Sequence, residues 1–275
     1  MINSGLLKWL NAAAFLIMIA VNAMANLLPL GGNTTGMISE QYRNLFTPAP
    51  VTFAVWGVIY ALLAGFIVWQ FAGSRVVTER VVGGIGLMFL LSCMANVLWI
   101  LLWHNNLIPF SMIAMLALLA SLIFIMSVVG SETGIGRWAF STYLGWITVA
   151  AMANFVVMTI DFGWKAFAEP NQAATVVLIV LAALVVGLVG VWLKDWIYVA
   201  VGFWGITGIM IRQINDFGAG YRSVAVAAFL SAVVLLTTMV MIITDGLSSR
   251  SRQKRITMSS YVERYLPDQS GPGVK

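Results

Sequence analysis

The stretch Phe46-Thr-Pro-Ala-Pro-Val-Thr-Phe-Ala-Val-Trp-Gly-Val-Ile-Tyr60 changes from a loop to a membrane helix at about Pro50. Proline in a first helical turn costs little, because its missing N–H would be unbonded there in any case. Phe53, Trp56 and Tyr60 then fall at i, i+3 and i+7, which places them on one face of the helix. An aromatic face of this kind is typical either of ordinary bundle core or of one wall of a ligand cavity.

The composition of the whole chain is that of a membrane protein. Of its 275 residues, 61% are hydrophobic and 9% are charged, whereas a soluble domain carries roughly 25% charged residues. Apolar segments, most of them near the roughly 20 residues that span a bilayer core, follow one another along the chain. They are expected at about 7–29, 51–72, 81–103, 107–129, 138–160, 172–193, 196–212 and 223–244. The expected fold class is an all-α polytopic membrane protein with about eight transmembrane helices.

Lysine and arginine set the expected orientation. Eight spans place both termini on one side, and putting that side inside leaves 11 of the 15 basic residues in the cytoplasm. N-in, C-in is therefore the predicted topology. The longer loops at 31–49, 161–171 and 213–222 then lie outside, where they would form either a lid over a site or plain connectors.

The C-terminal residues 245–275 are expected to form a basic cytoplasmic tail. Ser249-Arg-Ser-Arg-Gln-Lys-Arg255 is a juxtamembrane basic cluster, and each of its charges is worth about 1 kcal/mol against anionic lipid headgroups. The whole tail, which ends in a segment with Pro267, Gly271 and Pro272, is expected to be disordered. Anionic lipids are the partner that this composition favours.

Polar and aromatic side chains recur in the outer half of several predicted helices. They are Asn22 and Asn26 in the first segment, Phe53, Trp56 and Tyr60 in the second, Asn96, Trp99 and Trp103 in the third, and Tyr143, Trp146 and Asn154 in the fifth. Buried amides are costly without hydrogen-bond partners, so asparagines in one layer indicate either an interhelical polar network or anchors for a ligand. An apolar, aromatic-lined cavity with few polar anchors suits a lipophilic planar ligand.

Several kinds of chemistry are missing from the sequence. No Asp, Glu, Lys or Arg lies in the middle of a span, which argues against an ion- or proton-coupled transporter. There is no P-loop and no nucleic-acid motif, and the single Cys93 and single His104 give no metal cluster. His104 could ligate a haem iron, but an interfacial histidine is the favoured interpretation. No catalytic residue and no metal site are predicted.

Three motifs resemble the tryptophan-rich sensory protein / translocator protein (TspO/MBR) family. They are Phe46-Thr-Pro-Ala-Pro…Phe53…Trp56…Tyr60 in the second segment, Asn96-Val-Leu-Trp99 in the third, and Tyr143-Leu-Gly-Trp146…Asn154 in the fifth. The chain departs from the family pattern at Thr142, where the family has Pro, and at Met152, where it has Tyr. The resemblance implies a TspO-like five-helix bundle over residues 1–160, followed by a three-helix transmembrane extension over 161–244.

The resemblance also implies a cavity for tetrapyrroles and other lipophilic ligands beneath the loop between the first two helices. The expected ligand-binding residues are Phe53, Trp56, Tyr60, Asn96, Trp99, Tyr143, Trp146 and Asn154. Arg43, Arg212 or Arg222 could meet ligand carboxylates. No resident cofactor is required, and a porphyrin or haem would be a ligand.

The function expected from these residues is that of a membrane receptor or sensor-like protein for such a molecule. An uncoupled transporter or facilitator of the ligand and a porphyrin-degrading enzyme are the alternatives. The expected location is the bacterial plasma membrane, with the lipid bilayer and a lipophilic small molecule as partners. A homodimer is compatible with the sequence, and no role is assigned to the last three helices.

Overall fold

The computed structural model describes residues 3–28, 32–130, 134–168, 171–216 and 220–265, without the side chains of 216 and 250–265. Helices make up nearly all of this part of the chain, and the one β-type pairing in it is an isolated bridge between Asn44 and Ala168. The elements in order are α1 (Ser4–Leu27), α2 (Thr35–Gln41), the 3-10 helix η2 (Pro50–Ala54), α3 (Val55–Ala72), α4 (Arg75–Ile85), α5 (Met88–His104), α6 (Ile108–Val129), α7 (Ile135–Asp161), α8 (Gln172–Leu193), α9 (Trp196–Asp216) and α10 (Arg222–Tyr265). The all-α expectation is confirmed.

The described helices also match the expected number of spans. Seven are long and apolar enough to cross a membrane, and the bent pair α4 and α5 makes an eighth if it counts as one span. The sequence predicts an unbroken segment over 81–103, but the pair is bent by 55° at a short break. Gly86 in that break has φ +57° and ψ −128°, a backbone conformation that side chains disfavour. The helix direction therefore changes where glycine allows it.

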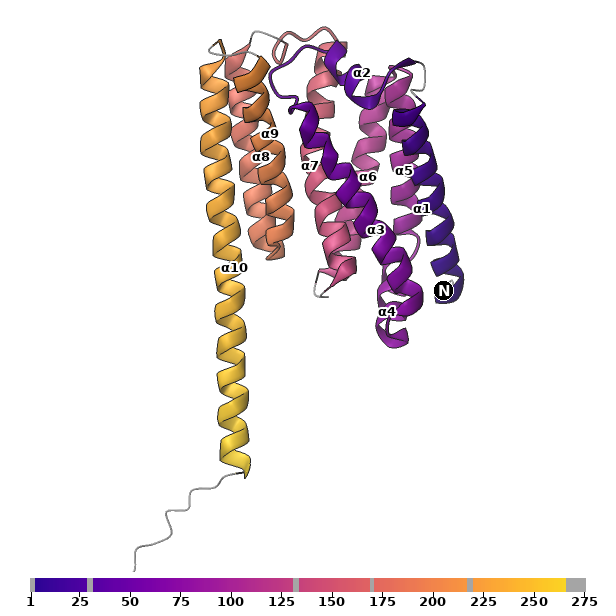
Figure 1. Cartoon of the computed structure of the whole chain (residues 1–275), viewed down its shortest axis with the longest axis vertical. Coiled ribbons are helices and arrows are strands. Elements are labelled where there is room, and N and C mark those ends of the chain that lie inside the picture. The colour runs from indigo at the N-terminus through magenta and orange to yellow at the C-terminus, as the bar shows by residue number, and fades with distance from the viewer. Residues whose placement is uncertain (1–2, 29–31, 131–133, 169–170, 217–219, 266–275) are drawn as a thin grey trace, which may run out of the picture.

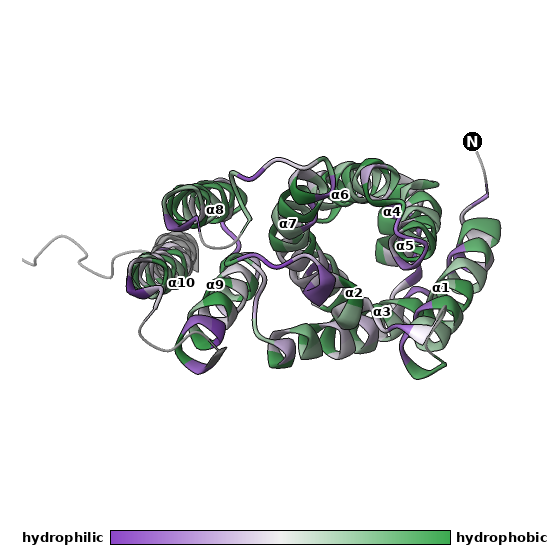
Figure 2. Cartoon of the chain, turned by 90° about the horizontal axis from the view of Figure 1, so that it is seen from above, coloured by the Kyte–Doolittle hydropathy of each residue, from purple (hydrophilic) through white to green (hydrophobic). Residues whose placement is uncertain are grey.

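The helices form two neighbouring groups (Figures 1 and 2). Seen from above, α1, α3, α5, α6 and α7 surround a common interior, while α8, α9 and α10 stand together beside α7. Helix α9 makes the main connection between the groups, because it packs on α7 and on η2. We call the end of the bundle that carries α2 the lid end. The start of α1 and the far part of α10 lie toward the opposite end (Figure 1).

A buried carboxylate holds α9 against α7 at the end opposite the lid. Asp195 Oδ1 accepts hydrogen bonds from the backbone N–H groups of Ile197 and Tyr198, at 3.0 and 3.1 Å, and so caps the start of α9. Its other oxygen accepts from Ser141 Oγ and lies 3.3 Å from Arg137 Nη2, both on α7. A buried carboxylate needs partners of this kind. The position of α9 relative to α7 is thereby fixed.

The last helix is longer than predicted. Helix α10 continues to Tyr265, so residues 245–265, which the sequence predicts as part of a disordered tail, are helical in this structure. The physical reason is local, since residues 247–265 contain neither glycine nor proline and nothing in them interrupts a helix. Pro267, Gly271 and Pro272 lie outside the described residues.

Candidate ligand cavity

A cavity of about 550 Å³ opens at the lid end of the bundle, among α1, α2, α3, α5 and α9. Its lining is mostly apolar and aromatic: Ile19, Ala23, Met37, Pro48, Pro50, Phe53, Trp56, Tyr60, Trp99 and Ile100, with polar groups from Asn22, Asn26, Thr34, Thr35, Ser39, Glu40, Thr47 and Arg212. A smaller recess of about 40 Å³ shares part of this wall and reaches α7. Both lie beneath α2 and the segment that leads into η2.

Six of the eight predicted site residues line this space. Phe53, Trp56 and Trp99 line both the cavity and the recess. Tyr60 lines the cavity alone, and Trp146 and Asn154 line the recess alone. Asn96 and Tyr143 line neither; both are fully buried behind the wall.

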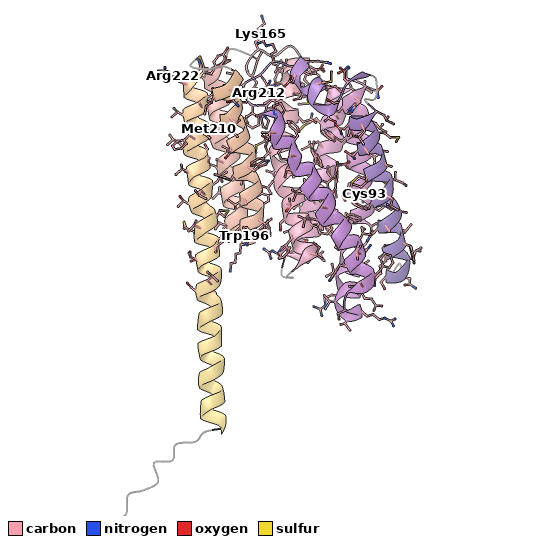
Figure 3. The ribbon with its side chains drawn as sticks, in the orientation of Figure 1. Cys93, Lys165, Trp196, Met210, Arg212 and Arg222 are labelled. Atoms are coloured by element: carbon pink, nitrogen blue, oxygen red, sulfur yellow. The ribbon has the colours of Figure 1, made fainter. Side chains whose placement is uncertain are left out.

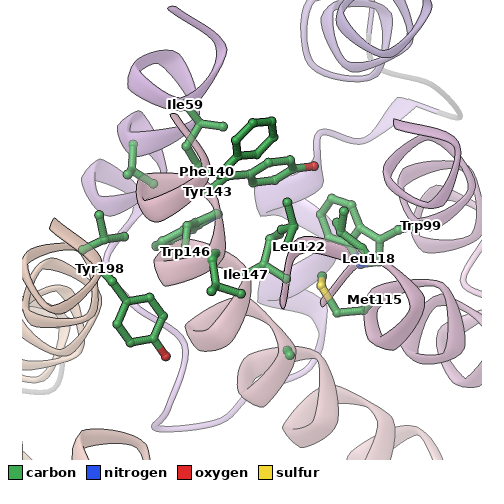
Figure 4. Close-up of a cluster of buried hydrophobic side chains, with 14 of the residues drawn as sticks. Ile59, Trp99, Met115, Leu118, Leu122, Phe140, Tyr143, Trp146, Ile147 and Tyr198 are labelled. Atoms are coloured by element: carbon green, nitrogen blue, oxygen red, sulfur yellow. The ribbon is translucent and has the colours of Figure 1, made fainter. Parts of the chain in front are cut away.

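Trp56 is the centre of the aromatic wall. Its ring makes stacked contacts with Tyr60 and with Trp99, at ring centroid distances of 5.5 and 6.1 Å and interplanar angles of 27° and 24°. Tyr143 and Trp146 meet it edge-on at 6.0 and 6.3 Å, and both project from α7 among the buried side chains of the bundle (Figure 4). These are favourable geometries for aromatic pairs, so the rings of the wall stabilise one another.

A chain of hydrogen bonds supports this wall from behind. Tyr60 Oη donates to Asn22 Oδ1 at 2.8 Å, and Asn22 Nδ2 donates to Asn96 Oδ1 at 2.7 Å. Asn96 Nδ2 then donates to Tyr143 Oη at 2.9 Å. The chain links α3, α1, α5 and α7. The sequence allowed the buried amides to form either an interhelical polar network or anchors for a ligand. Asn96 belongs to an interhelical network.

Asn154 orients a second tryptophan. Its Oδ1 accepts from Trp99 Nε1 at 2.9 Å, and its side chain also exchanges hydrogen bonds with Ser111 on α6, at 3.2 and 3.3 Å. Trp146 differs, because its Nε1 is buried and has no hydrogen-bond partner among the described residues. A buried N–H without an acceptor is costly, so a ligand acceptor reaching the recess could satisfy it.

We call the described part of the 31–49 loop, residues 32–49, the lid. Hydrogen bonds and buried side chains hold it in place. Asn44 Oδ1 accepts from the backbone N–H groups of Phe46 and Thr47, at 2.9 and 2.8 Å, which folds the chain into a turn. Leu45 and Phe46 are fully buried. Trp103 Nε1 donates to the carbonyl oxygen of Thr35 at 3.1 Å and holds the start of α2. Of the two interpretations of the 31–49 loop, its described part fits the lid.

A tyrosine ties the lid to α7. Tyr42 Oη donates to Asp161 Oδ1 at 3.1 Å. Partial burial of the phenol, together with the negative charge of Asp161, raises the pKa of Tyr42 to about 12. The phenol therefore stays protonated, and remains a donor to Asp161, throughout the physiological pH range.

Helix α9 completes the rim of the cavity. Trp204 Nε1 donates to the carbonyl oxygen of Thr52 at 2.9 Å, and Gln213 Nε2 donates to that of Leu45 at 2.8 Å. Between them, the N–H of Ala49 donates to the carbonyl oxygen of Gly208 at 2.9 Å. A Cβ on Gly208 would lie 2.1 Å from Thr52 Oγ1, so only glycine permits this approach. The glycine spacing of α9 indicates close packing, but the sequence does not say against what.

Two charged side chains face each other across the rim. Arg212 Nη1 of α9 lies 3.7 Å from Glu40 Oε1 of α2, and both residues line the cavity. Arg43 and Arg222, the other two arginines considered for ligand carboxylates, are not among its lining residues. His104 is not among them either; its Nδ1 lies 2.8 Å from the carbonyl oxygen of Ile100. No group of residues suited to hold a metal ion was found in the described ranges.

The fold and the cavity define a multi-pass helical membrane protein with an aromatic, largely apolar cavity at one end of its bundle. The profile of one family, described as TSPO-like protein, matches residues 8–241, and the chain belongs to this TSPO-like family. The match runs from α1 into α10 and so includes α8 and α9. No curated protein and no solved structure matches the chain.

Proposed function

We propose that this protein is a membrane receptor or sensor-like protein that binds a tetrapyrrole or another planar lipophilic molecule in the cavity at the lid end. The observation that carries the proposal is the cavity of about 550 Å³ with the stacked rings of Tyr60, Trp56 and Trp99 along one wall. Sites for small molecules are typically concave, largely apolar and a few hundred Å³ in volume, with a few polar groups that fix orientation.

The hydrogen bonds behind the wall also favour binding. The hydrogen bonds from Tyr60 through Asn22 and Asn96 to Tyr143 hold four helices in register, and Asn154 holds Trp99. A site that is already ordered spends less of its interaction energy on ordering when the ligand arrives. In the expected N-in, C-in orientation in a bacterial plasma membrane, the lid and the cavity would face outward.

The packing on the far side of the cavity supports a receptor over a facilitator. Phe66 follows Trp56 by ten residues, which is about 15 Å further along α3. There its ring meets Phe89 and Phe140, with centroid distances of 5.7 and 4.9 Å, and all three side chains are fully buried. We call these three the phenylalanine cluster. A ligand moving down the interior would have to displace this cluster.

The direct test is a titration of the detergent-purified full chain with protoporphyrin IX, followed by absorbance at the Soret band. We expect a saturable shift. Trp56→Ala should raise the Kd by about tenfold or more, because it removes a ring that stacks on both neighbours, while Trp56→Phe should retain most of the affinity. Trp164→Ala is the matched control, because Trp164 is exposed in the loop after α7.

Two results would overturn the proposal. One is the absence of any saturable shift with the folded wild-type chain. The other is an equal effect of Trp56→Ala and Trp164→Ala, which would place the binding outside the cavity. Flux of protoporphyrin IX into proteoliposomes without an ion gradient or ATP would favour the facilitator function over the receptor function.

A further inference from the structure

Arg212 brings a positive charge to the edge of an otherwise apolar cavity. It projects from α9 near the lid end (Figure 3), and its side chain is only 13% exposed. Its ion-pair partner Glu40 lies on the short helix α2 and is 54% exposed. Within the described lining of the cavity, these two side chains are the charged ones.

Glu40 and Arg212 differ in how well water can solvate their charges when the ion pair separates. Glu40 is already more than half in solvent, so water can solvate its carboxylate if the side chain turns outward. Arg212 is largely removed from solvent, and its guanidinium offers five N–H donors, so it can bond a ligand carboxylate at close range in addition to the partners that it already has. At 3.7 Å the contact with Glu40 is a loose ion pair and not a close bidentate one.

We propose that the cavity selects an anionic amphiphile, whose carboxylate pairs with Arg212 in place of Glu40 while its apolar body lies against Trp56 and Trp99. This inference rests on the proposed ligand-binding function and adds the chemical class of the ligand. It also gives α9 a role: the helix supplies the residue that determines specificity and, through Gly208 and Gln213, holds that residue at the rim.

Other assignments of charge fit the geometry less well. A cationic ligand would have to pair with Glu40, and the nearby charge of Arg212 would then repel it. A ligand carboxylate could otherwise seek Arg43, Arg222 or Lys165, but none of these lines the cavity. Arg212 is therefore the residue whose substitution should change the affinity for a ligand carboxylate in this cavity.

Protoporphyrin IX and its dimethyl ester are suitable probes, because they share one ring system and differ in the two carboxylates. We expect Arg212→Gln to raise the Kd of the acid by about tenfold or more, the loss typical of a charge-assisted hydrogen bond, and to leave the ester within about twofold. Arg212→Lys should keep most of the preference for the acid. Lys165→Gln, which removes one exposed positive charge at the same end (Figure 3), is the matched control.

Glu40→Gln provides a test that misfolding cannot imitate. Removing the competing carboxylate should lower the Kd of the acid several-fold and leave that of the ester unchanged. The inference is overturned if the ester of the wild-type chain binds in a Trp56-dependent manner but Arg212→Gln weakens acid and ester alike, or if Glu40→Gln weakens the acid. In both cases the proposed function survives. If neither probe binds the wild-type chain, the proposed function is wrong, and this inference, which rests on it, is wrong as well.

Discussion

The hydrogen-bond chain behind the aromatic wall should contribute measurably to stability, and Asn96→Leu tests this. Leucine has the same number of side-chain heavy atoms with the same branching, but it cannot form hydrogen bonds. The substitution removes the bond of 2.7 Å from Asn22 and the bond of 2.9 Å to Tyr143. Side-chain hydrogen bonds between membrane helices are worth about 0.6 kcal/mol on average and about 1.7 at most, so the loss should be about 1–3 kcal/mol.

The assay is reversible unfolding of the purified chain in mixed micelles of increasing SDS content, followed by circular dichroism. Asn26→Leu is the matched control, because the Asn26 side chain donates to the carbonyl oxygen of Asn22 in its own helix, at 3.0 Å. The effects of Asn22→Leu and Asn96→Leu should be less than additive, since the two residues share a bond. The reasoning is refuted if Asn96→Leu costs no more than Asn26→Leu, or if the two network changes add fully.

Four further predictions concern the packing around the cavity and the hydrogen bond between Tyr42 and Asp161. Gly208→Val should destabilise the chain by about 1–3 kcal/mol in the same unfolding assay, because the new side chain would overlap η2; an unchanged midpoint would contradict the close approach. Replacing Phe66 and Phe140 by alanine should give protoporphyrin IX flux in proteoliposomes above the wild-type level, and equal flux would mean that the phenylalanine cluster is not the barrier. Stability should fall as pH rises from about 10 toward 12, because the pKa of Tyr42 is raised in the folded state and the unfolded chain loses that proton first. NMR titration of labelled tyrosine should show the pKa of Tyr42 lowered by Asp161→Asn but still above its ordinary value, since burial is the larger cause; no change would exclude the contribution of Asp161.

The positions of the helices could be predicted because lipid imposes them. A backbone in hydrocarbon must satisfy its own hydrogen bonds, so an apolar run of about 20 residues forms a helix whatever surrounds it. The predicted segment at 107–129 thus matches α6 (Ile108–Val129) almost residue for residue. The break at Gly86 could not be predicted in the same way, because glycine permits a bend but only packing decides whether one occurs.

The aromatic face of α3 was predictable from spacing, since i, i+3 and i+7 share a face in any helix. Phe53, Trp56 and Tyr60 accordingly line one cavity. The separate roles of the asparagines were not predictable. Asn96 is joined to α1 and α7 behind the wall while Asn154 lines the recess, and this depends on how far each helix is rotated about its axis.

By itself, the sequence determined the fold class, the helical segments and the layer in which aromatic and amide side chains gather. These follow from local periodicity and from the bilayer as solvent. Only the tertiary structure decided which of three arginines meets the cavity. Arg212 lies more than 150 residues after Trp56 in the chain, and the glycine contact of α9 with η2 brings both to one space. Contacts between residues so distant in sequence depend on the packing of whole helices, and no local pattern records them.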